Sequence, residues 1–226
     1  TQGAATKEQF SVVGSGDALY QPMYLTVETL RSRGKATQAV VDGAAARPGE
    51  PLNFLPGPVP ITAGVHEAFA RPAVSHRSAV FVRDFHATRR ALCTLANAHD
   101  VQLIMGSGSV ANDAVAAALS RDGGEGVILS NGAFGERLVD HATRFGLRFR
   151  VHRAEWGAPF GPEALALALD ALPAPTWLWV VHGETSTGVL NDLPLLKALT
   201  AQRGIRLCLD AVSSLGSIDF RMGDWR

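Results

Sequence analysis

Several apolar, strand-like runs in the sequence are followed directly by glycine-rich or polar residues that suit ligand binding. The first of these stretches is Gly106–Ser109 (GSGS), between an apolar run and a helical pattern. Its glycines let the backbone approach an anion, and the next helical turn adds N–H donors beside two serine hydroxyls. It lacks the lysine of a Walker loop and the three glycines of a dinucleotide fingerprint. The stretch suits a phosphate monoester, but a tight turn with a serine cap explains it equally well on its own.

Two further loops carry an aromatic ring and a dense set of polar groups. Asn131–Gly135 (NGAFG) holds Phe134 between two glycines. Taken alone, this ring is better explained as a core plug than as a platform for a planar ligand. His182–Gly188 (HGETSTG) has a histidine, a glutamate and three hydroxyls. A simple turn does not need so many polar groups, and at a sheet edge they require partners. This loop indicates ligand binding, although His182 itself is well explained as a brace.

Asp210 ends the apolar run 205–209 and opens a loop of small residues. Open α/β folds bind ligands at the carboxyl edge of the sheet, although many strands end in Asp for turn formation alone. A phosphate cradle, a flat ring, hydroxyls and a carboxylate at one edge match pyridoxal phosphate (PLP). Asp210 is expected to keep the pyridine nitrogen protonated, so that the ring remains an electron sink.

A regular alternation of strands and helices must position these residues. Strands are predicted over 101–105, 126–130, 147–152, 177–182 and 205–209. Helices are predicted over 63–70, 78–99, 110–120, 135–145, 162–172 and 192–203. Repeated βα units with short loops predict an α/β fold, with a mostly parallel sheet, helices on both faces and right-handed crossovers.

Residues 1–50 differ in character from the rest and predict an N-terminal arm or the tail of an upstream domain. A helix is expected there from about residue 21 to 33, with a linker at 44–51. Residues 51–226 are expected to form the main domain, which begins with a proline-rich turn at 55–60.

The composition excludes several classes of protein. The formal net charge is zero, 46% of the residues are hydrophobic and 19% are charged, which is typical of a soluble globular protein. This balance predicts neither a nucleic-acid partner nor a membrane-surface patch, and no apolar run is long enough to span a membrane. Both cysteines, Cys93 and Cys208, lie in apolar elements and predict buried thiols in a reducing compartment, so a cytoplasmic location is expected.

Taken together, these stretches resemble a known family. NFLPGPVP with SHR, MGSGSVANDAV, NGAFGER, HGETSTGVLND and LDAVSSLGS follow the order found in class V aminotransferases. The resemblance is greatest to the alanine–glyoxylate and serine–glyoxylate (serine–pyruvate) group and covers about residues 53–216. It implies a fold-type I large domain with a seven-stranded sheet, a smaller domain and a homodimer with active sites at the interface. It also implies PLP-dependent transamination between an alanine- or serine-like amino acid and a 2-oxo acid such as glyoxylate or pyruvate.

The resemblance assigns roles to individual residues of this chain. The implied cofactor-binding residues are Ser107, Gly108, Ser109, Phe134, Thr185, Asp210 and Val212. The first three bind the phosphate, Phe134 and Val212 cover opposite faces of the ring, and Thr185 hydrogen-bonds its hydroxyl. Asp210 pairs with the ring nitrogen. Gly57 and Pro58 line the substrate pocket, and no metal is expected.

One part of the family pattern is missing. The family's Schiff-base lysine follows the aspartate motif by a further strand and loop, and Lys7, Lys35 and Lys197 do not match that position. Since transamination requires this amine, the chain alone is expected to be inactive and to be a piece of a longer polypeptide. The family's substrate-binding arginine also comes from beyond the matched motifs. A chain break near a modified lysine, or a natural truncation of a non-catalytic homologue, would equally leave the lysine out.

Alternative functions remain open. A cysteine desulfurase-like lyase usually has a histidine where Phe134 stands, which argues against it. A phosphonate transaminase is a closer rival, although the loop Ser75–Arg77 (SHR) favours the glyoxylate group. A non-catalytic scaffold domain that keeps the PLP fold is the alternative from another class. A nucleotide-binding α/β domain lacks support because neither a ribose-binding acid nor a Walker lysine is found.

Overall fold

A computed structural model describes residues 24–25, 52–53, 61–218 and 221–222. The chain divides into two compact units, Thr1–Pro72 and Ala73–Arg226. In the first unit, β1 (Tyr24–Leu25) pairs antiparallel with β2 (Leu52–Asn53). The following helix, α3 (Ala63–Phe69), confirms the short helix predicted there.

The strand β1 corrects one prediction. The helix expected from about residue 21 to 33 is wrong at Tyr24–Leu25, because backbone pairing with β2 outweighs the local helical spacing of apolar residues. The rest of that helix, the linker at 44–51 and the proline-rich turn at 55–60 lie outside the described residues.

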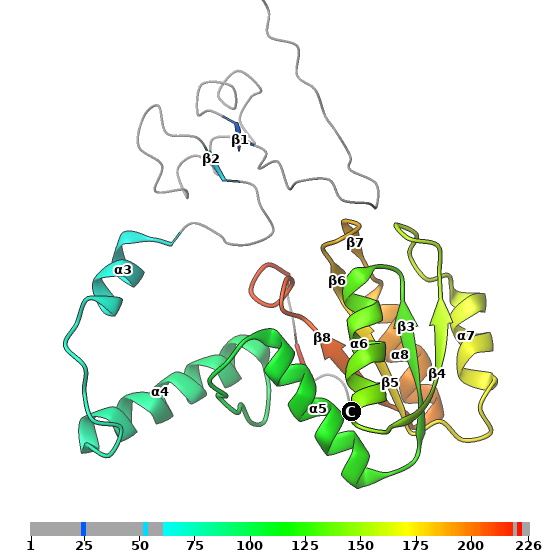
Figure 1. Cartoon of the computed structure of the whole chain (residues 1–226), viewed down its shortest axis with the longest axis horizontal. Helices are drawn as coiled ribbons and strands as arrows, with labels where there is room; N and C mark the ends of the chain where they lie inside the picture. Colours follow the sequence, from blue (N-terminus) through cyan, green and yellow to red (C-terminus); the bar gives the residue numbers. More distant parts are fainter. Residues whose placement is uncertain (1–23, 26–51, 54–60, 219–220, 223–226) are drawn as a thin grey trace, which may run out of the picture. The chain divides into compact units, whose positions relative to one another are not determined.

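The second unit is built on a parallel sheet. Its strands are β3 (Glu125–Ser130), β4 (Arg148–Arg153), β5 (Trp177–Val181) and β8 (Arg206–Asp210). Its helices are α4 (Ala79–Ala96), α5 (Gly108–Asp122), α6 (Ala133–Arg144), α7 (Pro162–Asp170) and α8 (Leu193–Arg203). The four strands pair in the order β4-β3-β5-β8, all parallel (Figure 1). A parallel sheet with a helix in each crossover confirms the predicted α/β fold.

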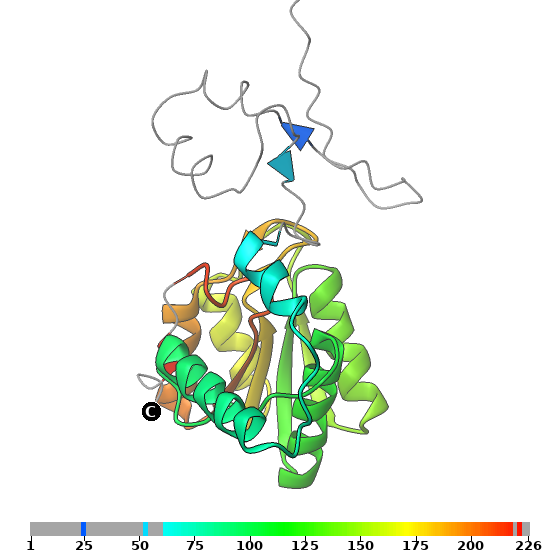
Figure 2. The same ribbon diagram turned by 90° about the vertical axis from the view of Figure 1, so that its left-hand side faces the viewer.

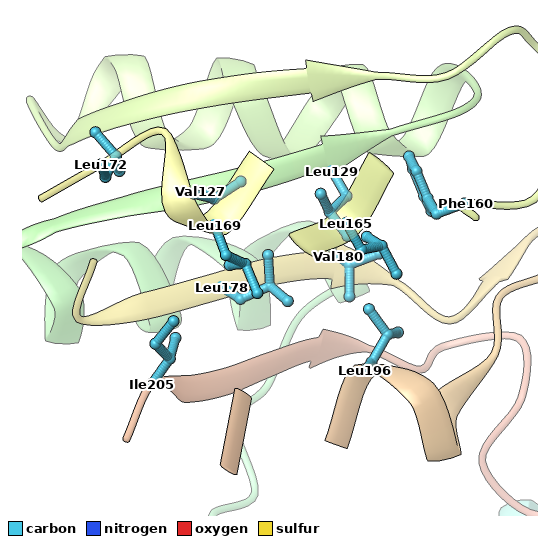
Figure 3. Packing of buried hydrophobic residues seen from close by; sticks show 10 residues of the cluster. All are labelled: Val127, Leu129, Phe160, Leu165, Leu169, Leu172, Leu178, Val180, Leu196 and Ile205. Carbon is cyan, nitrogen blue, oxygen red and sulfur yellow. The ribbon is translucent and has the colours of Figure 1, made fainter. Parts of the chain in front are cut away.

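Successive side chains of each strand point to opposite faces of the sheet and contribute to two apolar cores, one on each face. The first core, shown in Figure 3, consists of Val127, Leu129, Phe160, Leu165, Leu169, Leu172, Leu178, Val180, Leu196 and Ile205. The second consists of Ala116, Leu119, Ile128, Leu138, Ala142, Trp177, Trp179 and Val181. Helices α7 and α8 therefore cover one face, and α5 and α6 cover the other (Figure 2).

The ends of two helices follow local sequence signals. The side chains of Ser78 and Asp192 each accept a first-turn N–H, which begins α4 and α8. Asn97 and Gly204 follow the last turns in the left-handed conformation, with φ of 47° and 64°. Both predicted helices are confirmed, although the cap at Asn97 ends α4 at Ala96 rather than near residue 99. No helix among the described residues is long and apolar enough to cross a membrane.

The strand predicted over residues 101–105 is wrong, because the structure has no strand there. Leu103, Ile104 and Met105 are exposed instead, Met105 to 99%. A strand needs a backbone partner, and in the described part of the chain β8 at the sheet edge pairs with β5 alone. The described sheet accordingly has four strands, whereas the resemblance implies seven.

The polar run after β5 is a short hairpin rather than the loop expected from sequence. Strands β6 (Gly183–Glu184) and β7 (Val189–Leu190) pair antiparallel. Gly188, between them, has a φ of 74°, which an L side chain rarely adopts. The hairpin fixes the backbone on both sides of Thr185.

Candidate active site

The candidate site lies at the carboxyl edge of the parallel sheet. Along the chain, β4 is added on one side of β3 and β5 on the other, so the crossovers reverse direction between β3 and β5. Open α/β sheets bind ligands at such a switch point. Phe134 and Thr185 follow β3 and β5, and Asp210 ends the neighbouring strand β8.

A buried carboxylate joins the segments that follow β3 and β5. Glu184 is fully buried, and its Oε2 accepts the N–H groups of Phe134 (3.1 Å) and Gly135 (2.9 Å). Its Oε1 accepts the N–H (3.2 Å) and hydroxyl (2.6 Å) of Ser186. The Ser186 Oγ in turn accepts the N–H of Ala133 at 2.9 Å. Together the side chains of Glu184 and Ser186 cap the first turn of α6. The positive end of the helix dipole also stabilises a negative charge at this position.

Two glycines permit this close packing. A Cβ on Gly132 would lie 2.5 Å from the Glu184 side chain, and one on Gly135 would lie 2.7 Å from the Cα of Ser130. Both are shorter than real Cβ contacts. Glycine is therefore needed at both positions: Gly132 lets Glu184 of the hairpin approach the start of α6, and Gly135 lets α6 approach the end of β3.

Phe134 belongs to the first turn of α6, which corrects the bare loop expected from sequence. Its ring packs against the second apolar core and remains partly exposed. The Arg137 guanidinium lies 4.9 Å from the ring centroid. The ring thus serves the core, as the plug interpretation predicts, and is still accessible at the sheet edge.

The GSGS stretch forms the start of α5. The helix begins at Gly108, two residues earlier than predicted, so that Gly108 and Ser109 belong to its first turn. Ser107 is the N-cap residue, but its hydroxyl makes no capping hydrogen bond. Gly106 has a φ of 152°, and a Cβ there would lie 2.8 Å from Val110 Cγ2. The uncommitted serine hydroxyl weighs against the simple serine-cap explanation.

Asp210 is held by two donors. The Asn112 Nδ2 donates to its Oδ2 at 2.9 Å, and the Val212 N–H donates to its Oδ1 at 3.1 Å. A Cβ on Gly108 would lie only 2.9 Å from Val212 Cγ2. The first turns of α5 and the end of β8 are thus in direct contact, although they are far apart in sequence.

His182 braces the loop that follows Asp210. The ring is almost fully buried, and its Nδ1 lies 2.9 Å from the hydroxyl of Ser214. Its backbone N–H donates to the Asp210 carbonyl at 2.9 Å. Burial lowers the pKa of His182, because the protein interior disfavours the charged ring. The bracing role expected for this residue agrees with these contacts.

The structure brings together some, but not all, of the residues that sequence singles out. Gly108 contacts Val212 across the α5–β8 junction, and Phe134 is tied to the Thr185 hairpin through Glu184. Gly57 and Pro58 lie outside the described residues. Among the described residues, no group of three or more His, Cys, Asp or Glu is arranged to hold a metal.

Two residues at this edge have functions that the sequence did not predict. The sequence patterns indicate neither the bond from Asn112 to Asp210 nor the capping of α6 by Glu184, which they place only within a polar run that suits ligand binding. The signal for Asn112 is its spacing, since a residue four positions after Gly108 lies one helical turn further along the same face. For Glu184 no local spacing signal exists, because it caps a helix about 50 residues away in sequence.

The fold and the residues at its sheet edge define an α/β domain of the PLP-dependent transferase type. The family model "Aminotransferase class-V" matches residues 63–226. The chain therefore belongs to the class V aminotransferase family, as the motifs indicate, and the cofactor of this family is PLP.

Individual relatives agree with this assignment. The chain is 32% identical over 187 residues to a 2-aminoethylphosphonate–pyruvate transaminase of Rhizobium meliloti, covering 79% of this chain and 47% of that relative. It is 30% identical over 180 residues to an L-aspartate–glyoxylate aminotransferase of Paracoccus denitrificans, with 76% and 45% covered. A solved alanine–glyoxylate aminotransferase of Nostoc sp. has a TM-score of 0.69 and 31% identity, over 75% of this chain and 45% of the other. The chain spans about half the length of the curated relatives it matches.

Proposed function

We propose that the second unit holds PLP at the carboxyl edge of its sheet, as the cofactor-binding part of an aminotransferase. The close approach of Gly108 to Val212 carries this proposal. It brings the first turn of α5, with its N–H groups and serines, beside the strand end that carries Asp210. A ligand with a phosphate at one end and a basic ring nitrogen at the other matches these two groups.

The donors at the start of α5 fit a phosphate. The hydroxyl of Ser107 makes no capping bond. The Val110 N–H donates to the Ser107 carbonyl at 3.0 Å, whereas the N–H groups of Gly108 and Ser109 precede the first hydrogen bond of the helix and point out of its N-terminus. Ser109 adds a second exposed hydroxyl in that turn. The positive end of the helix dipole adds to the attraction for a dianion. We assign Ser107, Gly108 and Ser109 to the phosphate.

The groups near β5 and β8 fit the ring. Each oxygen of Asp210 accepts one hydrogen bond from the protein, and a carboxylate retains further acceptor sites for a pyridine N–H. We assign the ring nitrogen to Asp210 and the two ring faces to Phe134 and Val212. Thr185, held in the hairpin beside the buried Glu184, would donate to the ring hydroxyl.

Within this arrangement the chain binds and polarises the cofactor. PLP supplies an electron sink for the charge that develops on the substrate's α-carbon. Asp210 would hold a proton at the ring nitrogen, and Phe134 and Val212 would orient the ring. Lys197 lies within α8, and we assign it no role in anchoring the cofactor. The anchoring amine is expected from another part of a longer polypeptide, so the 226-residue chain should not transaminate alone.

The proposed substrates are an alanine- or serine-like amino donor and a 2-oxo acid such as glyoxylate or pyruvate, with Gly57 and Pro58 near the substrate. The solved alanine–glyoxylate aminotransferase and the aspartate–glyoxylate relative support this choice. A second candidate donor is 2-aminoethylphosphonate, because several relatives are 2-aminoethylphosphonate–pyruvate transaminases at 30–36% identity.

Assembly and location are part of the same proposal. We expect a homodimer in the cytoplasm, with residues 1–50 as an arm and residues 51–226 as part of the large domain. Exposed apolar residues on α4 and in the segment 101–105 support an assembly or further domain that covers them. Mass measurement in solution on the complete polypeptide tests the dimer.

Binding of pyridoxamine phosphate tests the cofactor site in the chain as it stands. This probe has no aldehyde, so it does not form adducts with the lysines. We expect saturable binding that weakens at least tenfold for pyridoxamine, which lacks the phosphate. Equal affinity for the two probes would contradict the phosphate assignment. Donor assays on the complete polypeptide, with alanine, serine and 2-aminoethylphosphonate, then separate the two substrate candidates.

A further inference from the structure

The hydrogen bond between Asn112 and Asp210 joins two residues 98 positions apart. The donor atom is fixed by chemistry: a carboxylate only accepts, so the amide nitrogen of Asn112 must face it. The second carboxylate oxygen accepts the Val212 N–H. Because each oxygen has its own donor, the carboxylate is held in one orientation.

Asn112 also belongs to the helix that begins with the phosphate-binding residues. It follows Gly108 by four positions, which is about one turn, or roughly 6 Å along the axis of an α-helix. Gly108 approaches Val212, and Asn112 binds Asp210, so one turn of α5 meets the end of β8 at two successive points. The distance between the GSGS residues and the carboxylate is therefore set by this junction.

We propose that Asn112 is a positioning residue of the cofactor site, which orients Asp210 toward the ring nitrogen and ties it to the helix that holds the phosphate. The proposal rests on the proposed role of Asp210. In this proposal Asn112 acts on the Asp210 carboxylate and is assigned no contact with the cofactor itself. Loss of its amide would free the carboxylate to rotate and would weaken its contact with the ring nitrogen, while the phosphate contacts remain.

A purely structural role for Asn112 competes with the positioning role, since Asn112 is half-buried and its bond also docks α5 on β8. The two roles differ in their dependence on the ring nitrogen. A docking role affects every ligand of the site alike, whereas a positioning role affects only ligands that present a ring nitrogen to Asp210.

The experiment therefore compares two probes, pyridoxamine phosphate and its 1-deaza analogue, in which a C–H replaces the ring nitrogen. Dissociation constants are measured by fluorescence titration for the wild-type chain and for Asn112→Leu, Asp210→Asn and the double variant. Leu has nearly the size of Asn but no donor. Ser109→Ala is the matched control on the same helix, because both probes carry the phosphate. Thermal unfolding of each variant shows that it is folded.

We expect Asn112→Leu to weaken pyridoxamine phosphate binding roughly tenfold and to leave the deaza analogue unchanged within about twofold. Asp210→Asn should show the same selectivity with a larger loss. The double variant should bind no more weakly than Asp210→Asn, because Asn112 acts through Asp210. Ser109→Ala should weaken both probes equally.

Equal weakening of the two probes by Asn112→Leu, or additive losses in the double variant, would overturn the positioning role while leaving the role of Asp210 intact. Failure of the proposed function has a different pattern. In that case the wild-type chain binds neither probe, or binds both equally with no effect of Asp210→Asn, and the inference about Asn112 fails with it.

Discussion

At the scale of single residues, buried and half-buried polar side chains hold the candidate site in shape. Glu184 caps α6 beneath Phe134, and Asn112 binds Asp210. His182, which follows β5, holds the loop after β8 through the hydroxyl of Ser214. Each of these bonds joins segments that are distant in sequence. The residues expected to touch the ligand are mostly exposed or half-buried, so their positions depend on this inner set.

Replacement of Glu184 tests its capping role. Glu184→Ala leaves buried N–H groups of α6 and the Ser186 hydroxyl without their acceptor, and we expect a loss of about 2–4 kcal/mol in the free energy of unfolding. Glu184→Gln keeps one acceptor oxygen for the α6 N–H groups and should cost about 1–2 kcal/mol. Urea unfolding followed by circular dichroism measures both. Losses below about 0.5 kcal/mol for both variants, as for ordinary surface changes, would show that the cap is dispensable.

The lowered pKa of His182 predicts a pH dependence of stability. The unfolded chain takes up a proton near the ordinary value of about 6.5, whereas the folded chain resists it. Stability contributed by the neutral ring is therefore present above that pH and is lost as the pH falls below it. We expect the melting temperature to drop from pH 8 to pH 5, and to drop less in His182→Gln. Parallel curves for the two proteins would exclude His182 as the cause.

At the scale of elements, local patterns predicted most of the second unit. The alternation of apolar runs and helical patterns located α5–α8 and the strands β3, β4, β5 and β8 to within about two residues. The failures have a common physical cause. Residues 101–105 have strand composition without a described partner, and Tyr24–Leu25 pair with a distant strand. Partners are not encoded in local spacing.

The candidate site was predictable to a similar degree. The strand ends that carry Phe134, Thr185 and Asp210 lie along one sheet edge because parallel strands share their carboxyl ends. The bond from Asn112 to Asp210 was not predictable, since it depends on how α5 docks on β8. The cap formed by Glu184 is not predictable for the same reason, because its partners belong to another element, α6.

The docking of the β6–β7 hairpin on α6 gives a prediction at this scale. In Gly132→Ala the new Cβ would lie 2.5 Å from Glu184, and we expect a destabilisation of about 1–3 kcal/mol. Gly161→Ala is the matched control, because a Cβ there meets nothing within 4 Å and its φ of −77° is ordinary. Chemical unfolding measures the two variants side by side. Equal effects would mean that the close approach at Gly132 is not tight.

At the scale of the whole molecule, the second unit exposes apolar side chains on α4 that do not pack against either core of the parallel sheet. In α4 only Ala96 is buried, although the helix is apolar along one side. Its exposed apolar residues are Val80, Phe81, Val82 and Leu95. Exposed apolar groups of this kind favour association. The chain also spans about half the length of its curated relatives, so a covering segment or subunit fits the proposed assembly.

This exposure predicts self-association of the isolated chain. We expect sedimentation velocity to show oligomers whose fraction grows with concentration, and to show a several-fold smaller fraction in the double variant Phe81→Ser, Leu95→Ser. Leu167→Ser is the matched control, since Leu167 is 71% exposed on α7 and has no role in the proposed assembly. A monomeric wild-type chain at all concentrations would contradict the expectation.

The central claim is that Asp210 pairs with the ring nitrogen of a cofactor held at this sheet edge. Nitrogen NMR of bound pyridoxamine phosphate, labelled with ¹⁵N in the ring, tests it most directly. The measurement is made at a pH where the free ligand has lost the proton from its ring nitrogen. We expect a protonated ring nitrogen in the wild-type complex and an unprotonated one in Asp210→Asn. An unprotonated nitrogen in the wild-type complex, or the same signal in both proteins, would contradict the account.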